Sequence, residues 1–168
     1  HNRKHSFPTR RSSDLVEITA RSAVSRAYAR IWAQVPFMRH GVPGCGLFAV
    51  NAAGRARWDA FPDIIADDIF ARLHFAPGDR VRVPAPYRWP VAEGARALLR
   101  VRRRQDAGVA QIATLYPHLT ANEDKPPFVL RDTIRLASRD PAGFFVYAGI
   151  GALVRLFPAR DTRWSRGR

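Results

Sequence analysis

The chain has 168 residues, of which 46% are hydrophobic and 25% are charged. This balance provides enough apolar side chain for a core and excludes a wholly disordered chain. A single cysteine, Cys45, excludes an internal disulfide framework and a multi-cysteine zinc site. The formal net charge is +14, but only Lys4 and Lys125 are lysines, and such a bias toward arginine is what GC-rich coding produces. We therefore expect no nucleic-acid partner on the basis of charge alone.

Residues 5–15 read HSFPTRRSSDL. This string resembles the translation of a common short-read sequencing adapter over its whole length. We therefore expect residues 1–15 to be a foreign leader that packs against nothing, so that deleting them leaves the melting temperature unchanged. The chain proper is then expected to begin at Val16, within a longer gene. It divides into a main part, 16–130, and a C-terminal helix with a basic tail, 131–168.

Hydrophobic periodicity predicts a first helix over about 17–34, which ends before Pro36. After a loop, a short apolar run predicts a buried strand near 46–50. A short helix is expected to follow over 51–58 and to end at the Phe61-Pro62 break.

The next helix is expected over 67–74, because two acids in a first turn suit the positive end of the helix dipole. A turn at Pro77-Gly78-Asp79 leads to a strand near 80–84, and a helix is predicted over 91–104. Residues 105–127 show only weak periodicity, and their last part, 122–127, is expected to be an exposed loop.

The adjacent acids Asp67 and Asp68 are the most informative candidates for chemistry. Neighbouring helical positions point about 100° apart, so one carboxylate can face a cleft while the other caps the helix. A carboxylate next to apolar residues suits a general base, although helix capping explains one of the two acids equally well. Gly44 and Gly46 would let a ligand approach the backbone closely, and ordinary turn glycines explain them as well.

Five segments follow one another along the middle of the chain: YARIWAQVPF (28–37), VPGCGLFAV (42–50), AAGRARW (52–58), FPDIIADDIF (61–70) and RLHFAPGDRVRV (72–83). In this order they resemble the acceptor-side half of a family-2 glycosyltransferase with the GT-A fold. The resemblance implies an α/β fold, present as the C-terminal, acceptor-side part of GT-A, with an incomplete sheet and packed helices.

The resemblance also implies roles for individual residues. Asp68 would deprotonate an acceptor hydroxyl, which attacks the anomeric carbon of a nucleotide-linked sugar, and Asp67 would support it. Gly44 and Gly46 would form the floor of the sugar and acceptor site. The expected enzyme is inverting and non-processive, since the Q-x-x-R-W motif of the processive members does not occur.

The expected partners are a nucleotide-sugar donor and a sugar or lipid-linked acceptor. A divalent metal, Mg or Mn, is expected for the intact enzyme, but its D-x-D ligand motif is absent from this sequence and would belong to a donor-binding half upstream. Arg102 and Arg104 are candidate contacts to the diphosphate, with a solvated helix face as the alternative. No metal site is expected in this chain itself. The alternative function is a small basic non-catalytic domain that binds nucleic acid or an anionic membrane surface.

The last predicted helix covers about 143–158 and includes twelve uncharged residues, too few to cross a bilayer. It is expected either to pack in the core or to lie in a membrane interface. In the second case, anionic headgroups would meet the flanking arginines Arg135, Arg139, Arg155 and Arg160. The resemblance favours the interface, so the expected location is the cytoplasm with peripheral contact at the membrane face.

Overall fold

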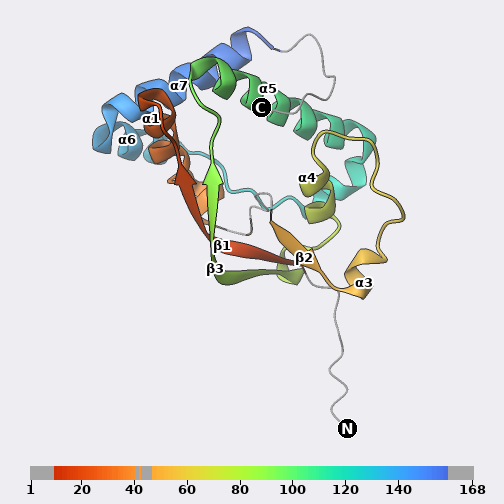
Figure 1. Cartoon of the computed structure of the whole chain (residues 1–168). Helices are drawn as coiled ribbons and strands as arrows, with labels where there is room; N and C mark the ends of the chain where they lie inside the picture. The colour runs from red at the N-terminus through yellow and green to blue at the C-terminus, as the bar shows by residue number, and fades with distance from the viewer. Residues whose placement is uncertain (1–9, 41, 43–46, 159–168) are drawn as a thin grey trace.

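A computed structural model describes residues 10–40, 42 and 47–158 (Figure 1). A small three-stranded sheet has the strand order β2-β1-β3 and is accompanied by helices, so the expected mixed α/β class is confirmed. The central strand β1 (Arg10–Thr19) runs antiparallel to β2 (Phe48–Val50) and parallel to β3 (Arg80–Pro90).

Near the start of the chain, the structure differs from the expected first helix and from the expected unpacked leader. The predicted helix over 17–34 is wrong at its start, because β1 continues to Thr19 and helix α1 covers only Ala23–Trp32. Ser22 fixes that start, since its side chain accepts a hydrogen bond from the backbone N–H of Ser25.

Residues 10–15 were expected to pack against nothing, whereas their backbone pairs in β1 with both neighbouring strands. Backbone pairing of this kind is open to any extended segment, whatever its side chains. The adapter resemblance stays a prediction.

Strand β3 begins where predicted but continues well beyond residue 84, to Pro90. It contains Pro84, Pro86 and Pro90, which have no backbone N–H to donate. A strand with such a composition is tolerated at a sheet edge, and β3 is an edge strand.

Two predicted elements around the candidate acids are confirmed in place. The strand β2 lies within 46–50, and helix α4 covers Asp67–Leu73. The short helix expected over 51–58 is shorter, since α3 covers Ala52–Arg55, with the Asn51 side chain accepting from Gly54 N–H at 2.7 Å. One-turn segments follow α1 and α4: α2 (Pro36–Arg39) and the 3₁₀ turn η1 (Pro77–Asp79).

The long helix α5 covers Ala95–Leu115, so it begins later and ends later than the predicted 91–104. Gly94, at φ +81°, precedes its first turn. Its second half was missed because only Gly108 and Ile112 are buried there, which leaves little periodicity in the sequence. The chain then forms the 3₁₀ turn η2 (Pro117–Asn122), the unpredicted helix α6 (Leu130–Arg139) and the predicted helix α7 (Pro141–Leu156).

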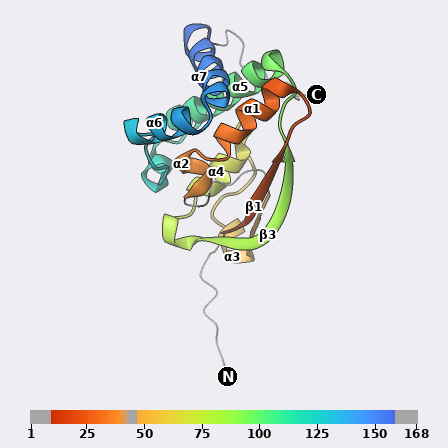
Figure 2. The same ribbon diagram turned by 90° about the vertical axis from the view of Figure 1, so that its left-hand side faces the viewer.

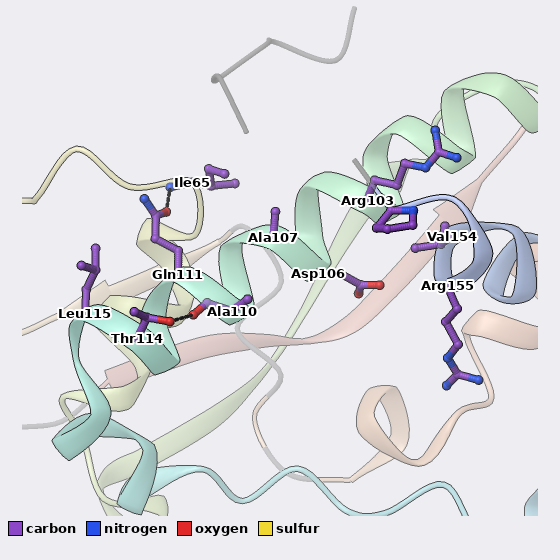
Figure 3. A pocket seen from close by; sticks show the side chains of 11 residues that line it. Ile65, Arg103, Asp106, Ala107, Ala110, Gln111, Thr114, Leu115, Val154 and Arg155 are labelled. Atoms are coloured by element: carbon purple, nitrogen blue, oxygen red, sulfur yellow. Dashed lines mark hydrogen bonds between the residues drawn. The ribbon is translucent and has the colours of Figure 1, made fainter. Parts of the chain in front are cut away.

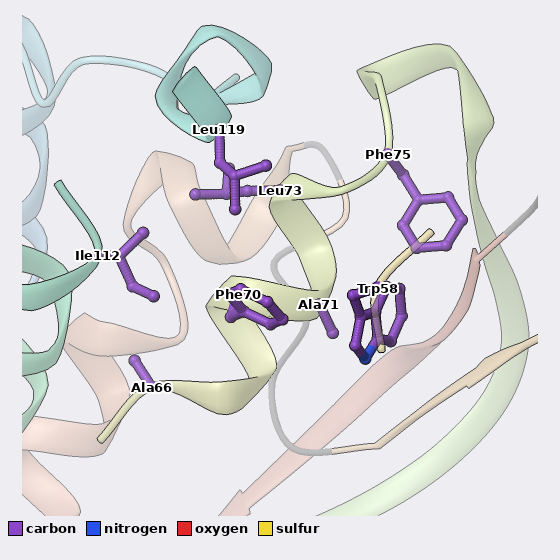
Figure 4. Packing of buried hydrophobic residues seen from close by; sticks show 8 residues of the cluster. All are labelled: Trp58, Ala66, Phe70, Ala71, Leu73, Phe75, Ile112 and Leu119. Atoms are coloured by element: carbon purple, nitrogen blue, oxygen red, sulfur yellow. The ribbon is translucent and has the colours of Figure 1, made fainter. Parts of the chain in front are cut away.

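Buried side chains form two hydrophobic clusters. The α4 cluster, shown in Figure 4, comprises Trp58, Ala66, Phe70, Ala71, Leu73, Phe75, Ile112 and Leu119. The α1 cluster comprises Tyr28, Ile31, Trp32, Val35, Leu98, Leu136 and Ile150. Helix α5 supplies Leu98 to one cluster and Ile112 to the other, and Figure 1 shows it extending from α1 and α7 to α4. Among the described helices, none is long and apolar enough to cross a membrane.

Candidate functional site

The acidic pair forms the first turn of α4, as predicted. The backbone N–H of Asp68 donates to Asp67 Oδ1 at 2.9 Å, and the N–H of Ile69 donates to Asp68 Oδ1 at 2.8 Å. The N-cap residue Ala66 has no side chain for capping, so the two carboxylates supply the negative charge at this helix end. Asp67 is exposed and Asp68 is half-buried.

Aromatic packing fixes the orientation of this short helix. Phe70 is only 4% exposed, and its ring centroid lies 4.4 Å from that of His74 and 5.0 Å from that of Tyr116. Because Phe70 follows Asp68 by two positions, the two side chains point to roughly opposite sides of the helix. Burying Phe70 therefore directs Asp68 away from the α4 cluster.

Helix α5 fixes the segment just before the acids. The backbone N–H of Ile65 donates to Gln111 Oε1 at 2.9 Å. A Cβ atom at Gly108 would lie 2.8 Å from the Cβ of Ala66, so the glycine allows a close approach between α5 and the start of α4. These two contacts set the position of the first turn of α4, which carries Asp67 and Asp68.

A cavity of about 690 Å³ lies beside this segment, between Ile65, α5 and the end of α7 (Figure 3). Its walls are largely apolar, with polar side chains from Arg103, Asp106, Gln111, Thr114 and Arg155. Apolar walls with a few polar groups are typical of a small-molecule pocket. Ile65 precedes Asp67 by two residues, so the cavity and the acidic pair share one short stretch of chain, but neither Asp67 nor Asp68 lines the cavity.

Arg102 and Arg104 lie elsewhere. They line a separate cavity near Trp89, and the cavity next to Ile65 is instead lined by Arg103. Arg102 Nε lies 3.3 Å from Asp106 Oδ1. Burial acts to lower the pKa of Arg102, but Tyr28, Asp106 and Tyr147 outweigh it and leave the pKa above its ordinary value. The structure thus places Arg102 at the junction of α1, α5 and α7. No described cavity brings it or Arg104 together with Asp67 or Asp68.

The two remaining candidates, Gly44 and Gly46, lie outside the described residues. The described strand β2 follows them, and its Phe48 and Val50 pack against the α4 cluster.

Two buried arginines support the other end of α4, and sequence reasoning missed both. Arg72 is 3% exposed and contacts Glu123 and Asp124, with Nη1 3.0 Å from Asp124 Oδ1. Arg80 donates to the Phe75 carbonyl through Nε at 3.1 Å and Nη2 at 2.8 Å, and to Asp124 Oδ1 through Nη1 at 2.5 Å. Burial lowers the pKa of Arg80, and the nearby charge of Arg72 adds to this effect.

The loop over 122–127 was expected to be exposed, and none of its residues is buried: Glu123, Lys125 and Pro127 are exposed. Asn122 also donates through Nδ2 to the Leu73 carbonyl at 2.8 Å, so the start of this loop is fixed to the α4 end. The acids lie more than forty residues from their arginine partners, and no spacing rule in the sequence signals such a pairing.

The described residues do not by themselves form a metal centre, because they bring no three His, Cys, Asp or Glu side chains together for a metal ion. The ligands expected for Mg or Mn were placed in a D-x-D motif that this sequence lacks.

Comparison of this chain with protein-family models, with curated proteins and with solved structures finds no match.

Proposed function

We propose that residues 16–168 are the acceptor-side part of a nucleotide-sugar-dependent glycosyltransferase, whose donor-binding half is encoded upstream. One observation carries the proposal. Helix α4 begins at Asp67 and Asp68, directs Asp68 away from the hydrophobic core, and follows directly on a segment that lines a cavity of about 690 Å³. Sugar transfer to a hydroxyl requires a general base within reach of the acceptor, and Asp68 follows by three positions a residue, Ile65, that lines the cavity.

In the proposed reaction, Asp68 accepts the proton of an acceptor hydroxyl as the hydroxyl oxygen bonds to the anomeric carbon of the donor. The bond between that carbon and the diphosphate breaks, and the diphosphate leaves with the electron pair. Attack from the side opposite the leaving group inverts the configuration. The N–H of Ile69 orients one oxygen of Asp68, and Asp67 stabilises the helix turn that carries it.

The cavity beside Ile65 suits the acceptor. Its apolar wall, which includes Ala107, Ala110 and Val154, fits the less polar face of a sugar ring or the start of a lipid chain. Gln111 and Thr114 provide polar groups, although Gln111 Oε1 already accepts a hydrogen bond from Ile65. Donor binding and the expected Mg or Mn ion are assigned to the upstream half.

The test is to express residues 16–168 joined to their genomic upstream sequence and to assay release of nucleoside diphosphate. UDP-glucose, UDP-N-acetylglucosamine and GDP-mannose serve as donors, with Mg²⁺ and with Mn²⁺. We expect a D-x-D motif upstream and turnover with at least one donor, whereas the 168-residue chain alone shows none. An upstream sequence without such a half, or an extended chain that binds none of the three donors in calorimetry, contradicts the proposal.

A further inference from the structure

Helix α7 has two apolar faces, and only one of them is covered. Phe144, Ile150 and Tyr147 pack in or against the α1 cluster. On the opposite side Phe145 is 79% exposed and Leu156 is 71% exposed. The outer face of α7 is defined here as Phe145, Ala148, Ala152 and Leu156, all of them exposed.

The spacing makes these four residues a continuous stripe. They follow one another at intervals of three, four and four positions, which places them on one side of an α-helix. From Pro141 to Val154 the helix contains no charged side chain. A helix in contact with water on one side normally carries polar residues there, so this stripe indicates a missing apolar partner.

Arginine side chains lie at both ends of the stripe. Arg139 precedes α7, Arg155 lies in its last turn, and both are exposed. The acids nearby are bonded within the protein: Asp140 Oδ2 lies 2.7 Å from Arg30 Nε, and Asp132 Oδ1 lies 3.2 Å from Arg135 Nη2. Around the outer face, arginine charge therefore remains available to an external partner, while the acidic charge is largely compensated.

Helix α6, which precedes α7, adds exposed apolar side chains at the same end of the molecule. Its Leu136 is fully buried, while Leu130 is 73% exposed and Ile134 is 61% exposed. These two residues are one turn apart, on the side of α6 away from Leu136. Figure 2 shows α6 and α7 next to each other at the end of the molecule away from the lower part of the sheet.

We propose that the outer face of α7 is a docking surface for an anionic lipid bilayer. An uncharged helical face bordered by arginines matches the acyl–headgroup boundary, where apolar side chains enter and cations meet lipid phosphates. A second copy of this chain matches less well, since each copy carries a formal charge of +14 and the two would repel.

The structure selects the variant for the test. Phe144 packs against the α1 cluster, so Phe144→Asp would damage the core, whereas Phe145→Asp changes an exposed residue. Val109, 50% exposed on α5, provides the matched control Val109→Asp, which adds the same charge outside the outer face of α7.

The experiment is flotation of the full 168-residue chain with vesicles of 70% phosphatidylcholine and 30% phosphatidylglycerol, and with vesicles of phosphatidylcholine alone. We expect binding to the anionic vesicles at low salt, and a loss of about tenfold or more at 0.5 M salt, because screening weakens the headgroup contacts. Phe145→Asp should weaken binding by about tenfold, since it removes one buried aromatic side chain from the interface. Val109→Asp should bind within about twofold of the original chain, and thermal melts should show that both variants are folded.

Absence of flotation at low salt overturns the proposal, and so does equal binding by the two variants. A dimer in solution that Phe145→Asp dissociates, without any binding to vesicles, assigns the face to a second copy instead. The readout needs no sugar donor, so these outcomes are independent of the proposed transferase activity.

Discussion

The α4 cluster and the α1 cluster are built in different ways. Trp58 contacts Phe61, Phe70, His74 and Phe75 by ring-to-ring packing, so most of the α4 cluster comes from one stretch of fewer than twenty residues. The α1 cluster joins side chains of α1, α5, α6 and α7, which are far apart in the sequence. The comparison indicates that the candidate site depends on local aromatic packing, while helix α7 is held by packing between helices that are distant in the sequence.

The largest expected effect on stability comes from truncating one large buried side chain in each cluster. Phe70→Ala should cost about 3–5 kcal/mol of unfolding free energy, and Ile31→Ala, at a residue with no exposure, about 2–5 kcal/mol. Urea denaturation measures both. Hydrogen exchange should then separate the two clusters: only Phe70→Ala should accelerate exchange at the amides of Asp68 and Ile69 under native conditions. Equal acceleration in the two variants would show that the clusters are one cooperative unit.

A smaller effect is expected at the buried arginine beneath α4. Arg80→Met should cost about 1–3 kcal/mol, because the Phe75 carbonyl loses its side-chain donors. The matched control is Arg30→Met, which removes an ion pair to Asp140 from an arginine side chain that is 53% exposed and should cost at most about 1 kcal/mol. Urea titrations with equal midpoints for the two variants would contradict the structural role given to Arg80.

Two glycines test the contact between α5 and α4. A glycine-to-alanine change inside a helix normally stabilises it by about 1 kcal/mol. At Gly149, where an added Cβ meets nothing within 4 Å, that gain should appear. At Gly108 the added Cβ would lie 2.8 Å from the Cβ of Ala66, so Gly108→Ala should destabilise by about 1 kcal/mol. A higher melting temperature for Gly108→Ala would show that α5 does not approach Ala66 this closely.

The smallest expected effect is a pH dependence located in the α4 cluster. Burial next to Trp58 and Phe70 lowers the pKa of His74 below its ordinary 6.5. The unfolded chain therefore binds a proton in a pH range where the folded chain does not. The contribution of neutral His74 to stability is complete above about pH 6.5 and falls as the pH drops from there toward the folded pKa. Melting temperatures between pH 8 and pH 5 should show this loss in the original chain and in His118→Gln, but less of it in His74→Gln. An unchanged slope in His74→Gln would assign the pH dependence to another group.

The parts of the fold that the sequence predicted are those whose signals are local. The start of α4 follows from Asp67 and Asp68, and the position of β2 follows from a short apolar run. Helix α6 was missed although its sequence separates apolar from charged residues at helical spacing, so a usable local signal was present there. The full length of β1 and β3 depends on pairing between segments some seventy residues apart, which single-sequence patterns do not report.

The candidate site likewise contains residues whose position the sequence predicted and residues whose position it did not. The acidic pair was predicted at a helix start, where the structure has it. Arg102 and Arg104 were grouped with it because their charge suits a diphosphate, but their position depends on the rotation of α5, which Tyr28 and Tyr147 help to set. The support from Arg72 and Arg80 depends on acids near η2 and could not be predicted from spacing.

The most direct test of the proposed transferase is the turnover of the extended chain, with its upstream half, after substitution of each acid. Asp68→Asn keeps the shape of the side chain and removes the base, so kcat should fall by about 10²–10⁴-fold while donor affinity is largely retained. Asp67→Asn, which removes a carboxylate from the same helix turn, should cost less. Equal kcat for the original enzyme and Asp68→Asn would contradict the assignment of Asp68 as the catalytic base.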